Sequence, residues 1–424
     1  MHTAITLSPT DLEQRQAYNI RLLTIWFLYT TFSGAVRKWI ITDPTTANLL
    51  LGVQIIAPLL FVIFTKTNRL RPATVNLIWG FTALLVLMAF NPLNQSLAHG
   101  LLGYCLQISV FFPLLVYLHD REAFPIERLN RLFLIIILIE VALGVVQFLS
   151  PYDSIVNKYV RDMSEFGGVA RLGSAGQARI TGTFSYIGGM TSLFTAIGFW
   201  VWGARLTRQP SIYIALLLVS CIIISPMTGS RGLTALLIIL TICAFLATVN
   251  EIRSTIALLL LGGISLAILQ ITNVTVVGEA YSGLNERVTA HNEDGESRTR
   301  IIGQIEEIID FRGEYPLFGT GLGATYQGAI ALFGESRALK EYGYYEEEPE
   351  RVILEGGFLL FFVRLLFWGV LFRRSTIPLL FSLLLIWLHL FYQVTVTNVF
   401  TAFYTVLGLM YLDRSYWLRN QKTV

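Results

Sequence analysis

A series of apolar runs, each long enough to cross a lipid bilayer as a helix, dominates this sequence. A transmembrane helix needs ~20 predominantly apolar residues. In lipid each segment must satisfy its own backbone polar groups, so helices are the only option for runs of this length. Charged residues make up 14% of the chain, whereas soluble domains carry about a quarter. The sequence therefore predicts an all-α polytopic membrane protein with about twelve transmembrane helices.

The expected helices lie on both sides of one long polar block. They cover residues 18–37, 47–65, 72–90, 99–118, 129–149, 183–204, 211–227, 231–249, 254–272, 352–372, 376–391 and 397–413. The chain thus divides into three parts. Residues 1–272 contain helices one to nine and an outer loop at 150–182. Residues 273–351 form a large loop between helices nine and ten, and residues 352–424 contain helices ten to twelve and a tail.

The basic residues of the short loops predict the orientation of the helices, because cytoplasmic loops carry an excess of Lys and Arg. Every second short loop is positive, and both ends of the chain are basic. The alternate short loops at 91–98 and 392–396 contain neither Lys nor Arg. Both termini are therefore expected in the cytoplasm. The loops at 150–182 and 273–351 are expected on the other side, which is periplasmic in a bacterium.

The distribution of charge argues against nucleic acid as a partner, because the basic residues are scattered among loops and do not cluster on one face. Cys105, Cys221 and Cys243 all fall within apolar runs. Buried free thiols are the ordinary state of such cysteines. We expect neither a disulfide nor a metal site from them.

Arg231 lies where a membrane protein would usually avoid a charge. It begins a helix that is otherwise apolar through Phe245. An arginine at a helix N-terminus opposes the helix dipole, and charge at the edge of the hydrocarbon is costly. Both costs disappear if Arg231 holds a pyrophosphate or a carboxylate, which the N–H groups of the helix start would also bind. The alternative is a side chain that extends toward the lipid headgroups.

Three further basic residues lie at the outer ends of expected helices. The pair Arg37-Lys38 ends the first helix, next to Trp39. It is either an anchor at headgroup level or an anion contact. Arg179 lies just before the sixth helix, in a glycine-rich and therefore turn-rich loop. It is either solvated or a contact for phosphate or sugar.

The large loop contains a segment with helical spacing from Ser297 to Phe311, where isoleucines recur on one face. At ~100° per residue, Arg298 falls in the middle of this apolar face and Arg300 on the polar side. Arg298 is therefore expected to turn toward the protein or the membrane, and Arg300 toward solvent. The glycines at 319, 321 and 323 allow close backbone approach but lack the βαβ context of a dinucleotide site.

Acidic residues gather where the large loop returns to the membrane. The run from Glu346 to Glu348 is interpreted as a solvated face or, alternatively, as ligands of Ca²⁺ or Mg²⁺. Glu350 is nearest the membrane entry and adjoins Arg351. A carboxylate in this position could accept a proton from an attacking hydroxyl.

Charged and polar side chains also occur within or beside the expected spans. Glu140 and Arg364 lie inside helices and are expected to face the interior of the bundle, where they could pair. His389 and Tyr392 belong to a polar cluster around the last outer turn that could line a cavity.

Several of these features occur in an order found in one known group of proteins. Gly229-Ser230-Arg231-Gly232 opens a helix, and Ser297-Arg298 precedes an amphipathic helix in a large outer loop. The segment 316–321 follows it, and Glu355-Gly356-Gly357 starts the next helix. This order resembles the O-antigen ligase and polymerase superfamily of bacterial envelope glycosyltransferases. The stretch from Phe32 to Trp39 resembles a motif of its polysaccharide-polymerase-like branch.

The resemblance implies a GT-C-like fold in the bacterial cytoplasmic membrane. It implies transfer of glycan from an undecaprenyl-diphosphate-linked oligosaccharide to a sugar hydroxyl on the periplasmic side, in O-antigen or exopolysaccharide synthesis. The implied reaction is inverting and uses no metal and no cofactor. Membrane lipid is an implied partner, and chain-length regulators or export proteins are further candidates.

The resemblance also implies roles for individual residues. The family's diphosphate-binding arginines correspond to Arg231 and Arg298, with Arg300 as a rival for the second, and Glu350 would orient or deprotonate the acceptor. The residues expected to bind substrate are Arg37, Lys38, Arg179, Arg300, Arg351 and Tyr392. Ligases carry a histidine near the end of the loop, where this chain has Glu350-Arg351, and His291 lies too early to replace it. This favours a polymerase-like member over an O-antigen ligase.

A transporter or flippase for lipid-linked oligosaccharides is the competing class. Transporters place their charges near the midplane on broken helices, whereas this chain places its arginines at the outer surface and in the outer loop. A third possibility is a non-catalytic scaffold of an export complex, in which the arginines would tolerate mutation.

Overall fold

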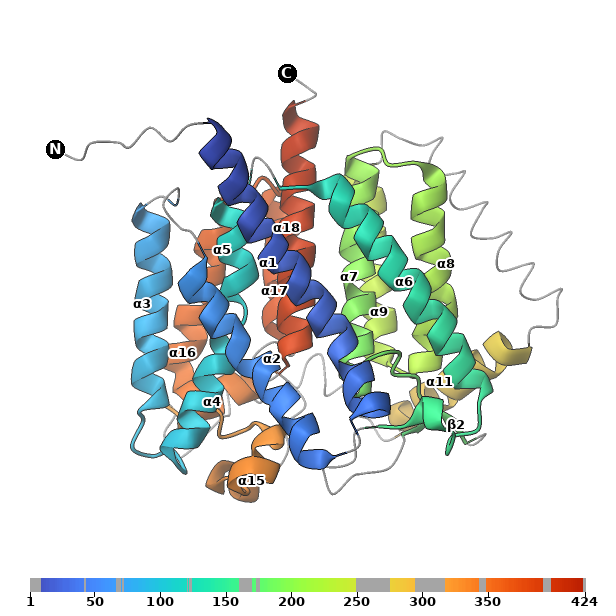
Figure 1. The fold of residues 1–424 in the computed structure, drawn as a ribbon, viewed down its shortest axis with the longest axis horizontal. Coiled ribbons are helices and arrows are strands. Elements are labelled where there is room, and N and C mark those ends of the chain that lie inside the picture. Colours follow the sequence, from blue (N-terminus) through green and yellow to red (C-terminus); the bar gives the residue numbers. More distant parts are fainter. Residues whose placement is uncertain are drawn as a thin grey trace.

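The structure is a computed structural model, and it is an almost entirely helical bundle (Figure 1). It describes residues 9–41, 43–65, 70, 72–119, 121, 124–159, 170–172, 176–248, 275–293, 317–342, 348–391 and 398–421. Within these ranges, seven helices are long and apolar enough to cross a membrane. The chain is therefore an all-α polytopic membrane protein, as the apolar runs predict.

The helices of the bundle connect two opposite ends of the molecule, the upper and lower ends in Figure 1. They are α1 (Pro9–Ala35) with its π-helical continuation η1 (Val36–Ile40), α2 (Pro44–Phe64), α3 (Pro72–Ala89), α4 (Leu97–Ile108), α5 (Phe111–His119), α6 (Ile126–Leu149), α7 (Ile187–Leu206), α8 (Ser211–Thr228), α9 (Arg231–Ala247), α16 (Glu348–Arg373), α17 (Leu379–Phe391) and α18 (Val399–Gln421). Further helical elements outside the bundle are η3 (Ile155–Asn157), α11 (Thr275–Glu293), η5 (Gln327–Ala329), α14 (Ile330–Phe333) and α15 (Arg337–Tyr342).

The expected helices correspond to observed ones with three exceptions, one of which, the break of the expected helix 352–372 at Gly357, is described below. The expected helix at 254–272 lies outside the described residues. The expected helix at 99–118 is divided into α4 and α5. Pro113 explains the division, because a proline has no N–H to bond the carbonyl four residues earlier, which here is that of Ser109. The outer loop at 150–182 contains a small antiparallel hairpin, β1 (Arg171–Leu172) and β2 (Gln177–Ala178), which an all-α prediction does not include.

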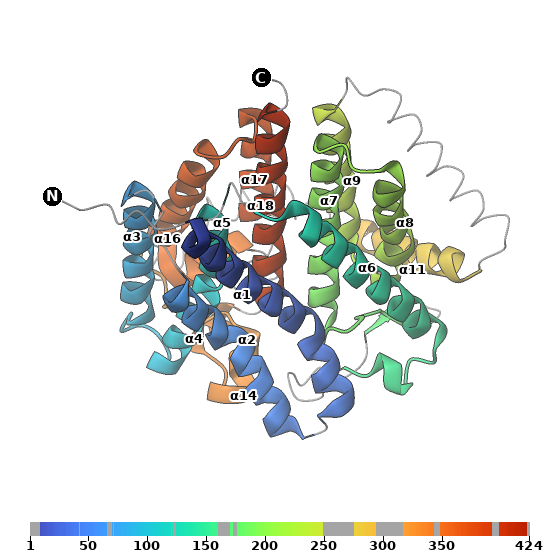
Figure 2. The same ribbon diagram turned by 45° about the horizontal axis from the view of Figure 1, so that its top comes forward.

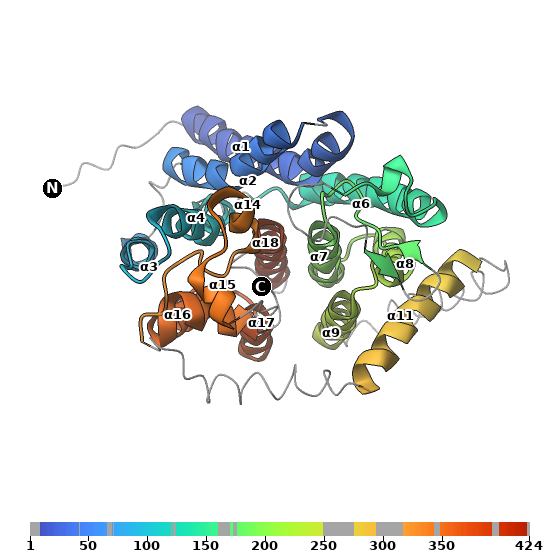
Figure 3. The ribbon, with the colours of Figure 1, turned by 90° about the horizontal axis from the view of Figure 1, so that it is seen from below.

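The centre of the bundle is formed by α7 and α18, which lie side by side while α1 and α2 run along one side (Figure 2 and Figure 3). Glycines allow this close approach. A Cβ on Gly203 would lie 2.4 Å from the ring of Tyr411, and one on Gly408 would lie 2.5 Å from the ring of Phe199. Small residues at helix contacts are the usual means of packing helices tightly in membranes.

The helix α11 is an element that the sequence patterns above do not predict. It lies across the lower end of the bundle, against α8, and is seen along its length when the bundle helices are viewed end-on (Figure 3). Its buried residues Ala280 and Leu284 are four apart, so they form one face of a helix. The Tyr281 hydroxyl donates to the carbonyl of Ile222 in α8 at 3.3 Å.

The helix α16 reverses direction within its length. Gly357 has φ of 65° and ψ of −174°, which is not helical. A straight helix would separate Glu348 from Arg364 by about 24 Å at 1.5 Å per residue, yet their side chains form an ion pair at 2.5 Å. The two halves of α16 therefore fold back on each other at Gly357.

Candidate functional site

Arg231 is the first residue of α9, as predicted, because the residues before it end one helix and start the next. Gly229 follows α8 with φ of 62°, the left-handed conformation that often ends a helix. The Ser230 hydroxyl then accepts a hydrogen bond from the N–H of Leu233 at 3.2 Å, which caps the new helix. The Arg231 side chain is half-buried here.

Two more arginines hold this turn from neighbouring elements. Arg179 Nε donates to the carbonyl of Thr228 at 2.7 Å, and Arg287 Nη1 donates from α11 to the carbonyl of Gly229 at 3.1 Å. A Cβ on Gly229 would lie 3.1 Å from Arg179 Nε and 3.2 Å from Arg287 Nη1, so both guanidinium groups reach this glycine. We refer to residues 228–231 together with Arg179 and Arg287 as the arginine turn.

The surroundings of the arginine turn hold it in one conformation. Leu172 of the hairpin is fully buried. Its Cδ1 lies 2.6 Å from the position of a Cβ on Gly229, and its Cγ lies 2.9 Å from that of a Cβ on Gly283 in α11. The Tyr159 hydroxyl donates to the carbonyl of Arg179 at 3.0 Å. Burial raises the pKa of Tyr159, with the charge of Arg179 acting in the opposite direction, so the phenol is a neutral donor at physiological pH.

The arginine turn lies at the boundary of a candidate membrane span. The candidate span of α8 ends at Thr228, so the turn lies where the apolar segment stops. Each guanidinium has five N–H donors in a planar fork that matches phosphate oxygens. The bonds to the carbonyls of Thr228 and Gly229 orient Arg179 and Arg287 at this turn.

Arg37 and Lys38 are buried, so they are not anchors at headgroup level. Lys38 Nζ donates to Thr181 Oγ1 at 3.0 Å and to the carbonyl of Gly182 at 2.6 Å. Arg37 Nη1 donates to Ser185 Oγ at 2.9 Å. The pair thus ties the end of α1 to the segment that runs from Arg179 into α7. A role for the pair in substrate binding remains a prediction.

The same segment is held from α6 by Glu140, which is fully buried. The carboxylate accepts hydrogen bonds from the N–H of Thr183 at 3.0 Å and from the Thr183 hydroxyl. Glu140 therefore faces the interior of the bundle, as expected. The expectation that it pairs with Arg364 is wrong, because Arg364 pairs with Glu348. The reversal of α16 brings Glu348 to Arg364 and removes the need for a distant partner.

A second polar cluster lies around the reversal of α16. Glu348 is buried, so it does not belong to a solvated acidic face, while Glu346 and Glu347 lie outside the described residues. Arg364 also donates from Nη1 to Gln107 Oε1 at 3.1 Å. His389 is buried against Trp368, with ring centroids 4.3 Å apart. The hydrogen bond from Arg364 to Gln107 thus joins α16 to α4, and the packing of His389 on Trp368 joins α16 to α17.

Glu350 and Arg351 lie in the first turns of α16, and both are buried. Arg351 is close enough to Glu355, one turn further along, to interact with its charge. The Glu355 Oε1 accepts from the N–H of Thr325 at 3.0 Å and from its hydroxyl at 2.6 Å. Glu350 and Arg351 thus lie in the same half of α16 as Glu355, whose carboxylate accepts hydrogen bonds from Thr325 of the large loop.

The glycines at 319, 321 and 323 allow the large loop to approach other backbone segments closely, as predicted. A Cβ on Gly319 would lie 2.5 Å from the carbonyl carbon of Glu355, and one on Gly323 would lie 2.2 Å from the carbonyl oxygen of His99. All three have positive φ values, which glycine adopts without strain. The segment therefore packs α16 against the start of α4.

The structure brings together only part of the predicted site. Arg179 and Arg231 share the arginine turn, and Arg37 and Lys38 lie further along the same segment. Within the described ranges, no hydrogen bond or ion pair given by the structure joins Glu350 or Arg351 to the arginine turn. Arg298, Arg300 and Tyr392 lie outside the described residues, so their assigned roles remain predictions.

Arg287 is the residue of the arginine turn that none of the sequence patterns above indicates. It lies in the polar block at 273–351, which is expected to form a loop. The signal that could have found it is the spacing of Val277, Ala280, Leu284 and Val288, which suits one face of a helix. On that helix Arg287 is three residues from Leu284, on nearly the same side.

Comparisons with known proteins give this chain no relatives. It matches no protein-family model, no curated protein and no solved structure. Among the described residues, no group of three or more His, Cys, Asp or Glu side chains is placed to hold a metal ion. The structure therefore defines the class, an all-α polytopic membrane protein, and a functional assignment has to come from the residues themselves.

Proposed function

We propose that this protein is a membrane glycosyltransferase that polymerises glycan repeat units from an undecaprenyl-diphosphate-linked donor. The observation that carries the proposal is the arginine turn. Arg179 and Arg287 come from separate parts of the chain and bind the backbone of the turn that Arg231 ends, at the boundary of a candidate span. A diphosphate on a lipid carrier lies at the same level and matches the charge and the donor geometry of guanidinium groups.

The proposed reaction breaks the bond between the anomeric carbon and the diphosphate. The acceptor hydroxyl oxygen attacks that carbon from the opposite face, its proton passes to a carboxylate, and the diphosphate leaves with the electron pair. The arginine turn neutralises the charge that develops on the leaving group. Arg298 or Arg300 would complete the phosphate contacts. Glu350 is the proposed proton acceptor, with Arg351 beside it.

The proposed topology places twelve helices in the bacterial cytoplasmic membrane with both termini in the cytoplasm. Its support is the division between the two ends of the bundle. The helix α1 begins and α18 ends at the upper end in Figure 1, whereas the hairpin, α11 and α15 lie at the lower end. The arginine turn is therefore at the end opposite to the termini, which is periplasmic in this proposal.

The test is a transfer assay with purified protein in detergent, supplied with lipid-linked oligosaccharide. Wild-type protein should form new glycosidic bonds. Arg231→Ala and Arg287→Ala should each lower the rate about 100-fold or more, because loss of one donor to a developing charge commonly has this effect. Arg337→Ala is the matched control, since this exposed arginine lies at the same end and forms an ion pair with Glu341, one turn further along α15. Unchanged transfer in both turn variants would reject the proposal.

The same assay separates the competing functions. A flippase or transporter would move the lipid-linked sugar between the leaflets of a vesicle and form no new bond. A ligase would join preformed polymer to a separate acceptor and would not extend the repeat-unit chain. A cell that lacks the protein would accumulate single repeat units if a polymerase is lost, and free polymer if a ligase is lost.

A further inference from the structure

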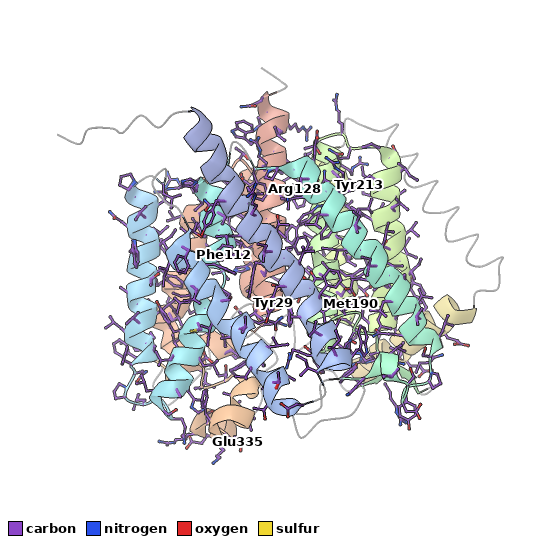
Figure 4. All side chains as sticks on the ribbon, viewed as in Figure 1. Tyr29, Phe112, Arg128, Met190, Tyr213 and Glu335 are labelled. Carbon is purple, nitrogen blue, oxygen red and sulfur yellow. The ribbon has the colours of Figure 1, made fainter. Side chains whose placement is uncertain are left out.

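A basic groove lies at the end of the bundle opposite to the arginine turn. Its cavity has a volume of about 560 Å³ and is formed where α6 begins and where α7 and α18 end. Arg128, which lines it, is labelled in Figure 4 at the upper end of α6, far from Glu335 at the lower end. The proposed glycan transfer makes no use of this groove.

The charges of the groove come from two helices. Arg128 and Arg131 lie three residues apart near the start of α6, so they project from nearly the same side, and both are exposed. Arg419 comes from the end of α18, where its Nη1 donates to the carbonyl of Ala247 in α9 at 2.8 Å. Among the described residues that line the groove, Glu127 is the one acidic residue. Within this part of the lining, three arginines therefore outnumber one carboxylate.

The position of the groove relative to the membrane follows from the helices that form it. The candidate span of α6 begins at Ile126, and that of α7 ends at Leu206. Both residues line the groove, together with Phe124 and Leu418. The apolar part of the lining thus lies at the ends of these spans, and Arg128 and Arg131 lie in the first two turns of the α6 span. This is the depth of the phosphate and glycerol groups of a phospholipid.

We propose that this groove binds the headgroup of an anionic glycerophospholipid. The phosphodiester would contact Arg128, Arg131 and Arg419, and the start of the acyl chains would pack on Leu418, which is only partly buried. Basic pockets between helices at a membrane surface are suited to such headgroups. A soluble phosphate would make no use of the apolar lining, and a zwitterionic lipid would bring a cation next to the arginines. The site does not depend on the proposed transfer reaction.

The experiment uses delipidated, purified full-length protein in detergent, titrated with phosphatidylglycerol and followed by native mass spectrometry. The variant Arg128→Gln/Arg131→Gln should bind this lipid about tenfold more weakly or worse, because each basic residue near a membrane surface contributes to attraction of anionic lipid. Arg21→Gln/Arg373→Gln is the matched control, since both arginines are exposed and lie outside the groove. The control pair should bind as the wild type does.

Several outcomes would overturn the proposal. One is an equal loss of binding in both double variants, which would indicate general attraction to positive charge. Another is equal binding of phosphatidylcholine. A third is displacement of the lipid by glycerol 3-phosphate at the same concentration, which would indicate a site for a soluble anion. Size-exclusion chromatography of each variant checks the fold. If the double variant does not purify, Arg131→Gln alone replaces it, and its affinity for phosphatidylglycerol should fall about threefold.

Discussion

Arg179 and Arg287 each donate a hydrogen bond to a backbone carbonyl of the arginine turn. The two bonds end at consecutive carbonyls, those of Thr228 and Gly229. Such bonds fix the direction of each guanidinium and reduce the entropy lost when a ligand binds, which is the benefit of a preformed site. At the scale of single residues, the small size of Gly229 makes this arrangement possible.

Gly229→Ala should therefore lower the stability of the folded protein by more than the strain of an alanine at positive φ alone. Alanine at a positive φ costs about 1 kcal/mol or more, and here its Cβ would also lie 2.6 Å from Leu172 Cδ1. Gly176→Ala is the control, because Gly176 has φ of 74° and nothing within 4 Å of the same position. Thermal unfolding in detergent should show a larger loss of stability for Gly229→Ala, and equal losses would contradict the packing described.

The elements that the sequence predicts well are those with local signals. Ser230 and Arg231 mark the start of α9, where the Ser230 hydroxyl accepts a hydrogen bond from the N–H of Leu233 at 3.2 Å. The reversal of α16 has no such signal, because Gly356-Gly357 is also compatible with an ordinary helix start. For this reason the partner of Arg364 was predicted to be Glu140 and is in fact Glu348.

The ion pair across the reversal of α16 should be essential for its stability. Glu348 and Arg364 side chains are 1% and 5% exposed, so Glu348→Gln removes the carboxylate that is paired with a buried guanidinium. Breaking such a pair costs about 3–5 kcal/mol. Glu341→Gln removes an exposed pair with Arg337 and should cost less than about 1 kcal/mol.

Unfolding temperatures of the two variants in the same detergent provide the comparison. A loss of stability in Glu348→Gln no greater than that in Glu341→Gln would show that the pair does not hold the two halves of α16 together. Transfer activity should fall in parallel with the loss of the fold, because Glu350 and Arg351 lie in the half-helix that the pair holds.

The outer loops show where prediction from sequence ends. Lys38 was expected at the surface because it follows an apolar run, yet it is buried by the segment 181–185, whose position depends on Gln147 and Glu140 in another helix. Arg287 was overlooked because the polar block gave no reason to expect α11 beside α8. Contacts of this kind join residues far apart in the sequence, and no local pattern contains them.

At the scale of the whole molecule, positive charge is found at both ends of the bundle for different reasons. The upper end carries the basic groove of Arg128, Arg131 and Arg419. In the proposed orientation this end is cytoplasmic, where the positive-inside rule favours such residues, and the arginine turn lies at the opposite, periplasmic end. The rule does not account for arginines at that end, and this supports the proposal that they bind a specific ligand.

The central claim is that the arginine turn binds the diphosphate of a lipid carrier, and a binding measurement tests it most directly. Native mass spectrometry of the purified protein should show that wild type binds undecaprenyl diphosphate about tenfold or more tightly than undecaprenyl monophosphate. Arg231→Gln/Arg287→Gln should bind the two lipids about equally, while Arg337→Gln keeps the preference. A double variant that retains the full preference for the diphosphate would contradict the account.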